Sequence, residues 1–237
     1  MAASLPGMTC RSTHSSSTGW RRCRTSTSPT AFIPTPAVSR SWSTASCPSS
    51  CNSSIAMPRL FAALPVPDEI ADALAPLQNG VPQAHWVPVE NLHITLAFMG
   101  NVEGATQRDL VDELGDIAGP PFAVRLSGVE AFSSGKRPIA LVAKVERGER
   151  LDWLQRKVAT VARNCGVSLE RRAFRPHVTL ARFADDAETG HHLAQFLASH
   201  ALFSAGPWIC EGFALYSSHR AGAGRAYVAE AEYPLTF

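Results

Sequence analysis

The chain has 237 residues, of which 45% are hydrophobic and 18% are charged, proportions that are typical of a globular protein. No apolar run approaches the roughly 20 residues that a transmembrane helix needs, which argues against a membrane partner. Five of the 22 basic side chains precede residue 57, which leaves 17 basic and 20 acidic side chains from that point onward. The folded part therefore lacks a global cationic field for nucleic acid, and any phosphate recognition must be local.

The first 56 residues differ in composition from the rest of the chain. Serine and threonine account for 23 of them, and they include five arginines but no lysine and no acidic residue. Such a segment buries too little apolar surface to offset its ordering entropy, so we interpret 1–56 as a disordered extension. The absence of an apolar core argues against a secretion signal, and scattered prolines argue against a transit peptide. We favour a start-site artefact, with the native protein beginning at Met57 and one folded domain at 57–237.

The remaining chain predicts two similar series of elements. The first series is a strand at 59–64, a helix at 68–77 with Asp68 as its N-cap, a strand that contains His93, a helix at 104–119, and strands at 122–132 and 139–146. The second series is a helix at 149–166 that ends near Gly166, a strand that contains His177, a helix at 187–200, and strands at 208–217 and 225–233.

The two series also agree residue by residue. A shift of 84 takes His93 to His177, Thr95 to Thr179, Leu96 to Leu180, Gly128 to Gly212, Ser133 to Ser217 and Ser134 to Ser218. A constant offset across separate elements indicates an internal duplication. We therefore predict an α+β fold with two pseudo-symmetric lobes of mostly antiparallel sheet, flanked by helices, and an active-site groove between the lobes.

Each predicted inner strand carries a histidine and, two residues later, a threonine. The strands read "NLHITLAFMG" at 91–100 and "FRPHVTLARF" at 174–183. Because side chains alternate across a strand, His93 and Thr95 share one face while the aliphatic residues take the other. The same alternation places His177 and Thr179 together. Each strand is therefore expected to bury its aliphatic face and to turn an imidazole and a hydroxyl into the groove.

Two facing imidazoles suit acid–base catalysis at a phosphodiester. With a reference pKa near 6.5, a neutral ring accepts a proton from the nucleophile while a protonated ring donates one to the leaving oxygen. The threonine hydroxyls can hold phosphate oxygens, and Arg175 or Arg182 can balance charge in the transition state. In an ideal strand, however, Arg182 points away from His177, so we expect it to act from the strand end or across a bend.

These motifs resemble those of the two-histidine phosphoesterase superfamily, and within it those of the RNA 2',3'-cyclic phosphodiesterase family, also called 2'-5' RNA ligase. The similar stretches are "RLFAAL", "NLHITLAFMG", "FRPHVTLARF" and the closing "ALYSS…RAYVAEAEYPL". They span nearly all of 57–237 and none of 1–56. The paired motif is specific for the superfamily and less specific for the substrate.

The resemblance implies hydrolysis of a 2',3'-cyclic phosphate at an RNA 3' end to a 2'-phosphomonoester, without a metal or cofactor. It also implies that His93 is the proton donor and that His177 is the proton acceptor that activates water. Thr95, Thr179 and Arg182 match family positions that contact phosphate. The reverse reaction, with a ribose hydroxyl in place of water, is 2'-5' RNA ligation. The implied partner is RNA with a cyclic phosphate end, tRNA fragments included.

Two other functions stay open at this point. One keeps the mechanism but acts on another cyclic nucleotide or a 2',5'-linked oligonucleotide, and the other is a non-catalytic RNA-binding module. The matched histidines argue against the binding module, because it needs no acid and base. We expect a cytoplasmic monomer in which Cys165 and Cys210 are reduced thiols.

Other features carry less weight. His191 and His192 are expected to be solvated on a polar helix, and His219 borders the groove at most. Trp86 and Phe98 are more typical of a core than of a surface that stacks on a base. The carboxylates of "DDAE" at 185–188 form no recognisable metal site with the histidines, and "RAGAGR" at 220–225 predicts a hairpin turn.

Overall fold

The computed structural model describes residues 59–135, 137–184, 189–221 and 224–236, so the extension expected at 1–56 lies outside the described residues. The strands are β1 (Arg59–Pro65), β2 (Ala84–Trp86), β3 (His93–Asn101), β4 (Phe122–Ser134), β5 (Arg137–Val145), β6 (His177–Phe183), β7 (Ser204–Cys210), β8 (Gly212–Ala221) and β9 (Gly224–Pro234). The helices are α1 (Asp68–Leu74), α2 (Gly104–Gly115), α3 (Glu149–Asn164) and α4 (Gly190–Ser199), with 3₁₀ turns at Ala75–Leu77 and Val89–Asn91.

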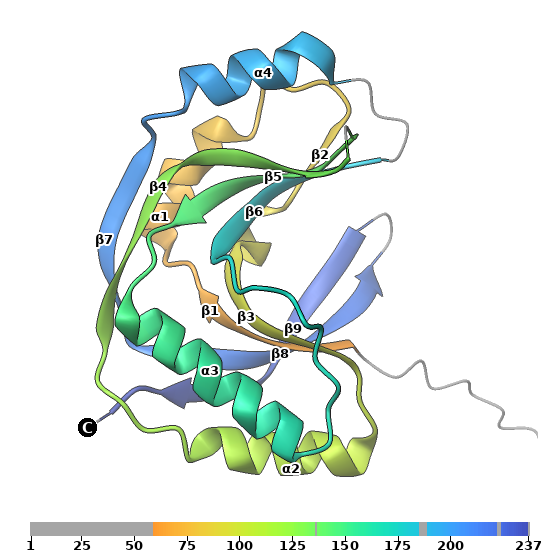
Figure 1. Cartoon of the computed structure of the whole chain (residues 1–237), viewed down its shortest axis with the longest axis vertical. Coiled ribbons are helices and arrows are strands. Elements are labelled where there is room, and N and C mark those ends of the chain that lie inside the picture. The colour runs from red at the N-terminus through yellow and green to blue at the C-terminus, as the bar shows by residue number, and fades with distance from the viewer. Residues whose placement is uncertain (1–58, 136, 185–188, 222–223, 237) are drawn as a thin grey trace, which may run out of the picture. The chain divides into compact units, whose positions relative to one another are not determined.

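The strands of the described residues form one antiparallel sheet with two lobes. Their order is β7-β4-β5-β6-β3-β1-β8-β9, and β2 pairs with residues 181–183 at the end of β6. β3 and β6 meet in the middle, where Ile94 lies opposite Val178. The predicted α+β fold with two mostly antiparallel lobes is thus confirmed, and the two histidine-bearing strands form the seam between the lobes (Figure 1).

Each lobe of the sheet contains strands from both halves of the sequence. Ser134 at the end of β4 lies opposite Arg137 of β5, and its counterpart Ser218 of β8 lies opposite Arg59 of β1. β5 therefore takes the same place beside β4 that β1 takes beside β8. The first repeat therefore begins with β1 and the second begins with β5. Our prediction that β5 ends the first series is wrong. Each lobe takes its third strand from the other repeat, which holds both inner strands at the centre.

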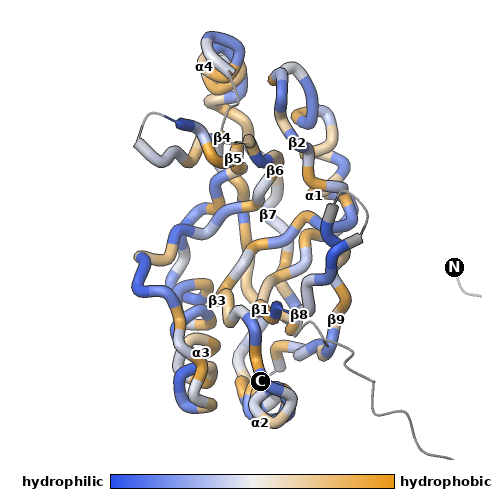
Figure 2. Tube along the Cα trace, turned by 90° about the vertical axis from the view of Figure 1, so that its right-hand side faces the viewer, coloured by the Kyte–Doolittle hydropathy of each residue, from blue (hydrophilic) through white to orange (hydrophobic). Residues whose placement is uncertain are grey.

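Helices cover the two lobes at opposite ends of the molecule. α2 and α3 pack on each other and against β9 and β3, whereas α4 contacts β4 and α1 contacts β7 (Figure 1). Leu110 and Leu114 of α2 are fully buried, as are Leu154 and Val158 of α3. This spacing of four residues is the apolar stripe of an amphipathic helix. The tube in Figure 2 is accordingly most apolar in the inner strands and mixed along the helices.

The helix ends agree in part with the sequence. Gly166 has a positive φ of 84° and follows α3, and the N–H of Val167 donates to the carbonyl oxygen of Ala162 at 2.9 Å, so this predicted end is confirmed. α1 begins at Asp68, but its N-terminus has no side-chain cap among the described residues. The helix predicted to reach residue 77 becomes a 3₁₀ turn at Pro76, which lacks the N–H that an α-helix needs there.

Two further predictions concern long segments. The strand predicted at 208–217 is in fact two strands, because the chain leaves β7, which pairs with β4, and enters β8, which pairs with β1. The hairpin predicted at 220–225 agrees with the pairing of Arg220 of β8 with Arg225 of β9, and its central residues 222–223 lie outside the described residues. None of the described helices is both long enough and apolar enough to cross a bilayer.

Candidate functional site

The two inner strands have the same burial pattern. Along β3, Ile94 and Leu96 are buried while His93 and Thr95 are half-buried. Along β6 the sequence His177-Val178-Thr179-Leu180 repeats this pattern position by position. The expected alternation is confirmed, so each strand directs a histidine and a threonine to the face opposite its aliphatic residues.

A β-bulge in β6 changes the position expected for Arg182. In the pairing with β5, Ala181 lies opposite Leu141, but Thr179 already lies opposite Val142, which leaves Leu180 as an extra residue. An extra residue reverses the alternation beyond it, so Ala181 is buried and Arg182 is exposed. Arg182 therefore lies on the same face as His177 and Thr179. The opposite orientation would hold only in an ideal strand, and the bulge agrees with the expectation that Arg182 acts across a bend.

The same bulge occurs in β3. Ala97 lies opposite Ala62 of β1 and Thr95 lies opposite Ala63, so Leu96 is the extra residue. Phe98, the counterpart of Arg182, is 46% exposed on the face of His93 and Thr95. Its interpretation as a core residue is wrong for the same reason. The duplication has thus preserved the bulge and changed the side chain that the bulge presents.

Both imidazoles make the same hydrogen bond to the backbone. His93 Nδ1 lies 2.7 Å from the carbonyl oxygen of Asn91, and His177 Nδ1 lies 2.7 Å from the carbonyl oxygen of Arg175. A carbonyl oxygen only accepts, so Nδ1 carries the proton in each ring. This fixes one tautomer and leaves Nε2 of each ring as the atom that can gain or lose a proton.

The surroundings lower the pKa of both histidines. Burial is the largest cause for His93, and the positive charges of Arg182 and His177 lower its pKa further, against the opposing effect of the bond to Asn91. For His177 burial again dominates, with Arg175 and Arg182 lowering the pKa while the bond to the Arg175 carbonyl and the charge of Glu130 raise it. The charge of His177 acts on His93, and Arg182 acts on both.

A cavity of about 360 Å³ brings together three of the five side chains predicted for the site, His93, Thr95 and Arg182. Its other lining residues are Arg59, Phe61, Phe98, Ser218, Arg225 and Tyr227. Among the described residues, His177 and Thr179 do not line this cavity, although they share the face of β6 with Arg182. A second cavity of about 490 Å³ shares His93, Phe61 and Tyr227 with the first as lining residues. A larger hollow of about 610 Å³ contains none of the five.

His93 lies in an aromatic cluster. The centre of its ring is 4.9 Å from that of Phe61 and 5.2 Å from that of Tyr227, which meets it edge-on. Phe61 and Tyr227 are themselves 5.0 Å apart, and Phe61 stacks on Tyr216 at 5.4 Å. These rings hold the imidazole in one position and exclude water from one side of it.

His177 has a charged neighbourhood instead. Phe132 meets its ring edge-on at 4.7 Å, and the guanidinium of Arg175 lies 4.6 Å from the centre of the Phe132 ring. Arg175 also donates to a Glu130 carboxylate oxygen at 2.7 Å. Arg175 is thus held by a carboxylate and a ring, which makes it a weaker candidate for phosphate than Arg182.

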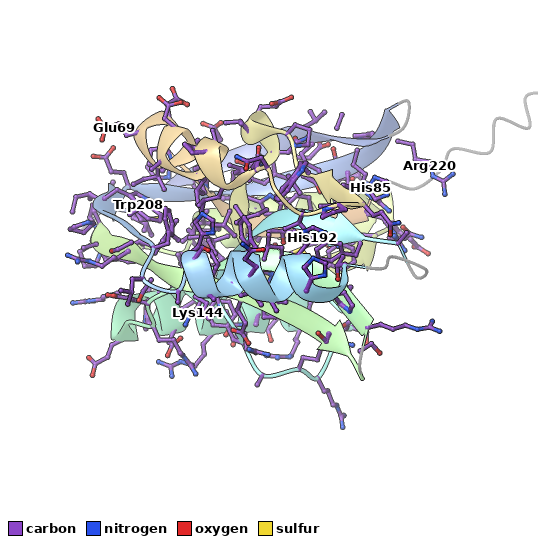
Figure 3. The ribbon with its side chains drawn as sticks, turned by 90° about the horizontal axis from the view of Figure 1, so that it is seen from above. Glu69, His85, Lys144, His192, Trp208 and Arg220 are labelled. Atoms are coloured by element: carbon purple, nitrogen blue, oxygen red, sulfur yellow. The ribbon has the colours of Figure 1, made fainter. Side chains whose placement is uncertain are left out.

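Sequence reasoning did not identify the aromatic rings or the arginines at positions 59 and 225. Ser218 and Tyr216 lie in the repeated "GFALYSS", and that repetition was the available signal. His191 and His192 are exposed on α4, as expected for solvated side chains, and His192 is labelled in Figure 3. His219 is exposed within β8 and bonds to Ser217 at 2.7 Å. The "DDAE" segment lies outside the described residues, which contain no group of three or more potential metal ligands.

Known proteins are similar to this chain in sequence and in fold. A family model described as the 2'-5' RNA ligase superfamily matches residues 66–222. An RNA 2',3'-cyclic phosphodiesterase from Geobacillus stearothermophilus is 32% identical over 128 residues, which are 52% of this chain and only 41% of that protein. A protein of the same name from Escherichia coli (strain K12) is 30% identical over 138 residues, 55% of this chain and 75% of that protein. The crystal structure of E. coli LigT complexed with 3'-AMP has a TM-score of 0.63 and 26% identity, covering 76% of this chain and 99% of that one.

Proposed function

The chain belongs to the 2'-5' RNA ligase superfamily, and from this premise we propose that it hydrolyses 2',3'-cyclic phosphate ends of RNA to 2'-phosphomonoesters. The observation that carries the proposal is the seam between β3 and β6. There two duplicated strands present a histidine each, and each ring has the same tautomer fixed by a backbone carbonyl. A pair of rings with free Nε2 atoms is what acid–base catalysis of phosphodiester cleavage needs.

The proposed reaction uses the two histidines in opposite roles. His177 Nε2 accepts a proton from water, whose oxygen attacks the phosphorus atom of the cyclic ester. The bond between phosphorus and O3' breaks, and His93 Nε2 donates its proton to that oxygen while O2' stays on the phosphate. The reaction leaves His177 protonated and His93 neutral, and proton exchange with solvent restores both. The assignment of donor and acceptor follows the resemblance to the family.

Thr95, Thr179 and Arg182 are proposed to bind the non-bridging phosphate oxygens. Both threonines are on the histidine faces of their strands, and the bulge at Leu180 directs Arg182 to the same face. A guanidinium at this position offsets the negative charge that develops on phosphorus oxygens in the transition state.

The lowered pKa values suit the two roles differently. A lowered pKa keeps His177 neutral near pH 7, as a base must be. His93 must carry a proton to act as an acid, and the negative charge of a bound cyclic phosphate favours its protonated form. Substrate binding itself is therefore expected to protonate His93.

Relatives and neighbours support the choice of substrate. The two relatives described above are named RNA 2',3'-cyclic phosphodiesterases, and one structural neighbour was crystallised with the nucleotide 3'-AMP. We also propose that tRNA fragments with cyclic phosphate ends are among the substrates and that 2'-5' ligation accompanies hydrolysis when a ribose hydroxyl replaces water as the group that attacks the phosphorus atom. The cytoplasmic location and the monomeric state stay predictions.

One assay separates the candidate functions. The protein is incubated, with EDTA present, with an oligoribonucleotide that ends in a 2',3'-cyclic phosphate, and the product is identified by its phosphate position. A 2'-phosphate is the expected product. Turnover of small cyclic nucleotides alone, or of 2',5'-linked oligonucleotides alone, would assign the alternative substrate, and binding without turnover would assign a binding module. A 3'-phosphate product would contradict the proposed bond cleavage.

A further inference from the structure

The cavity beside His93 has more positive charge than one phosphate requires. Its lining includes three arginines, Arg59, Arg182 and Arg225, and among the described residues no aspartate or glutamate lines it. Three guanidinium groups that line one cavity of about 360 Å³ give it a local positive potential. The composition of the wall therefore favours a ligand with more than one negative charge.

Among the described residues, no aspartate or glutamate forms an ion pair with any of these three arginines. Within the described part of the chain the ion pairs are formed by other arginines, namely Arg125, Arg147, Arg172 and Arg175. Arg225 donates to the hydroxyl oxygen of Ser218 at 3.1 Å, a neutral partner that leaves its charge uncompensated. Charged side chains in a concave wall without a counter-ion are candidates for recognition of an anionic ligand.

Two of these arginines lie away from the phosphate site proposed above. Thr95 lies opposite Ala63 on β1, and Arg59 is four residues farther along that strand, about 13 Å at the rise of a β-strand. Ser218 lies directly opposite Arg59 on β8 and is bonded to Arg225. Arg59, Ser218 and the guanidinium of Arg225 thus form one group displaced along β1 from His93, whereas the backbone of Arg225 lies beside Asn91, whose Nδ2 donates to the Arg225 carbonyl oxygen at 3.1 Å.

We propose that Arg59, Ser218 and Arg225 form a second phosphate subsite, which binds the internucleotide phosphodiester next to the terminal cyclic phosphate. This inference rests on the proposed function, because the cyclic phosphate bound at His93 determines which phosphate of the RNA reaches the second subsite. Guanidinium groups with a hydroxyl offer the fork of donors that phosphate oxygens accept. The preferred substrate is accordingly an oligonucleotide end rather than a cyclic mononucleotide.

Three substrates test the subsite. They are a nucleoside 2',3'-cyclic phosphate, a dinucleotide with the same cyclic end, and that dinucleotide with a neutral methylphosphonate in place of its internal phosphodiester. The measured quantity is kcat/KM for each, in the wild-type chain and in Arg59→Gln and Arg225→Gln. Arg137→Gln is the matched control, because Arg137 occupies on β5 the place that Arg59 occupies on β1.

The expected result is a preference of about tenfold or more for the charged dinucleotide over both the mononucleotide and the methylphosphonate analogue. Arg59→Gln and Arg225→Gln should each reduce this preference severalfold, and Arg137→Gln should leave it in place. Added salt should weaken the preference, since it depends on charge. A wild-type preference below twofold would overturn the subsite, as would an equal preference for the neutral analogue, which would assign the gain to the second base. Turnover of the mononucleotide tests the proposed two-histidine hydrolysis separately, because that reaction does not need the subsite.

Discussion

The seam places two copies of one strand side by side, and the surroundings of His93 and His177 show what duplication preserved and what it changed. The burial pattern, the bulge and the carbonyl bond to Nδ1 are the same in both copies. These features are set by the backbone register and by alternation, so they survive when neighbouring side chains change.

The side chains around the rings have diverged. Phe61 and Tyr227 surround His93, whereas His177 has Phe132 and the Arg175–Glu130 pair. After the bulge, one copy presents Phe98 and the other presents Arg182. An acid and a base need different electrostatic surroundings, so this divergence is what lets two equivalent positions take opposite roles.

Replacing either histidine should have the largest effect on activity. We expect His93→Ala and His177→Ala each to reduce the single-turnover rate on a cyclic phosphate end by at least about a hundredfold, the usual contribution of a general acid or base. His192→Ala, on the exposed surface of α4, is the control and should retain the wild-type rate. Near-wild-type turnover in either site variant would show that the residue lacks its assigned role.

Removing the guanidinium on the bulge should come next. Arg182→Gln is expected to lower kcat/KM by roughly ten- to a hundredfold, because one charged donor to the transition state is lost. Arg175→Gln is the comparison, and its effect should be smaller, since Arg175 is engaged by Glu130. Equal losses of kcat/KM in the two variants would mean that Arg182 contributes no more to phosphate binding than Arg175 does, despite its position after the bulge.

Replacing the two threonines compares the contributions of β3 and β6 to phosphate binding. Thr95→Val should reduce kcat/KM roughly tenfold, the size of one hydrogen bond to a charged group. Thr179→Val should have a smaller effect, because Thr95 lines the cavity and Thr179 does not, as far as the described residues show. A larger loss for Thr179→Val would place the phosphate nearer to β6 than we propose.

The smallest expected effect is a shift in the pH profile. The charge of Glu130 raises the pKa of His177, so Glu130→Gln should lower that pKa. If His177 is the base, activity falls as the pH drops through its pKa, and the acidic limb of kcat/KM should move to lower pH in the variant. A limb that moves to higher pH would reassign His177 as the acid or would mean that the loosened Arg175 no longer acts on the ring.

Much of the site follows from the sequence because it depends on local rules. Alternation along a strand needs only neighbouring residues, so the face shared by His93 and Thr95 was predictable from "NLHITL" alone. The constant offset of 84 likewise predicted two lobes of one architecture. Gly166 marked a helix end through its own backbone preference.

The features that were missed depend on partners far away in sequence. The bulges at Leu96 and Leu180 arise from the register against β1 and β5, which no local pattern reveals. Phe98 was therefore misjudged as a core residue, and the bend expected before Arg182 could not be located from the sequence. Strand exchange between the repeats likewise appears only in pairings such as Ser218 with Arg59. Composition gave no indication that arginines at opposite ends of the chain line one cavity.

The central claim is that His93 and His177 act on a single phosphate group, and NMR titration of the histidine ring nitrogens tests it most directly. The protein, labelled with ¹⁵N at histidine, is titrated with a nucleoside 2'-phosphate, the proposed product. We predict that the Nε2 signals of both rings shift along one binding curve with one Kd, while both Nδ1 atoms stay protonated. A shift of only one ring, or two curves with different Kd values, would contradict a shared phosphate.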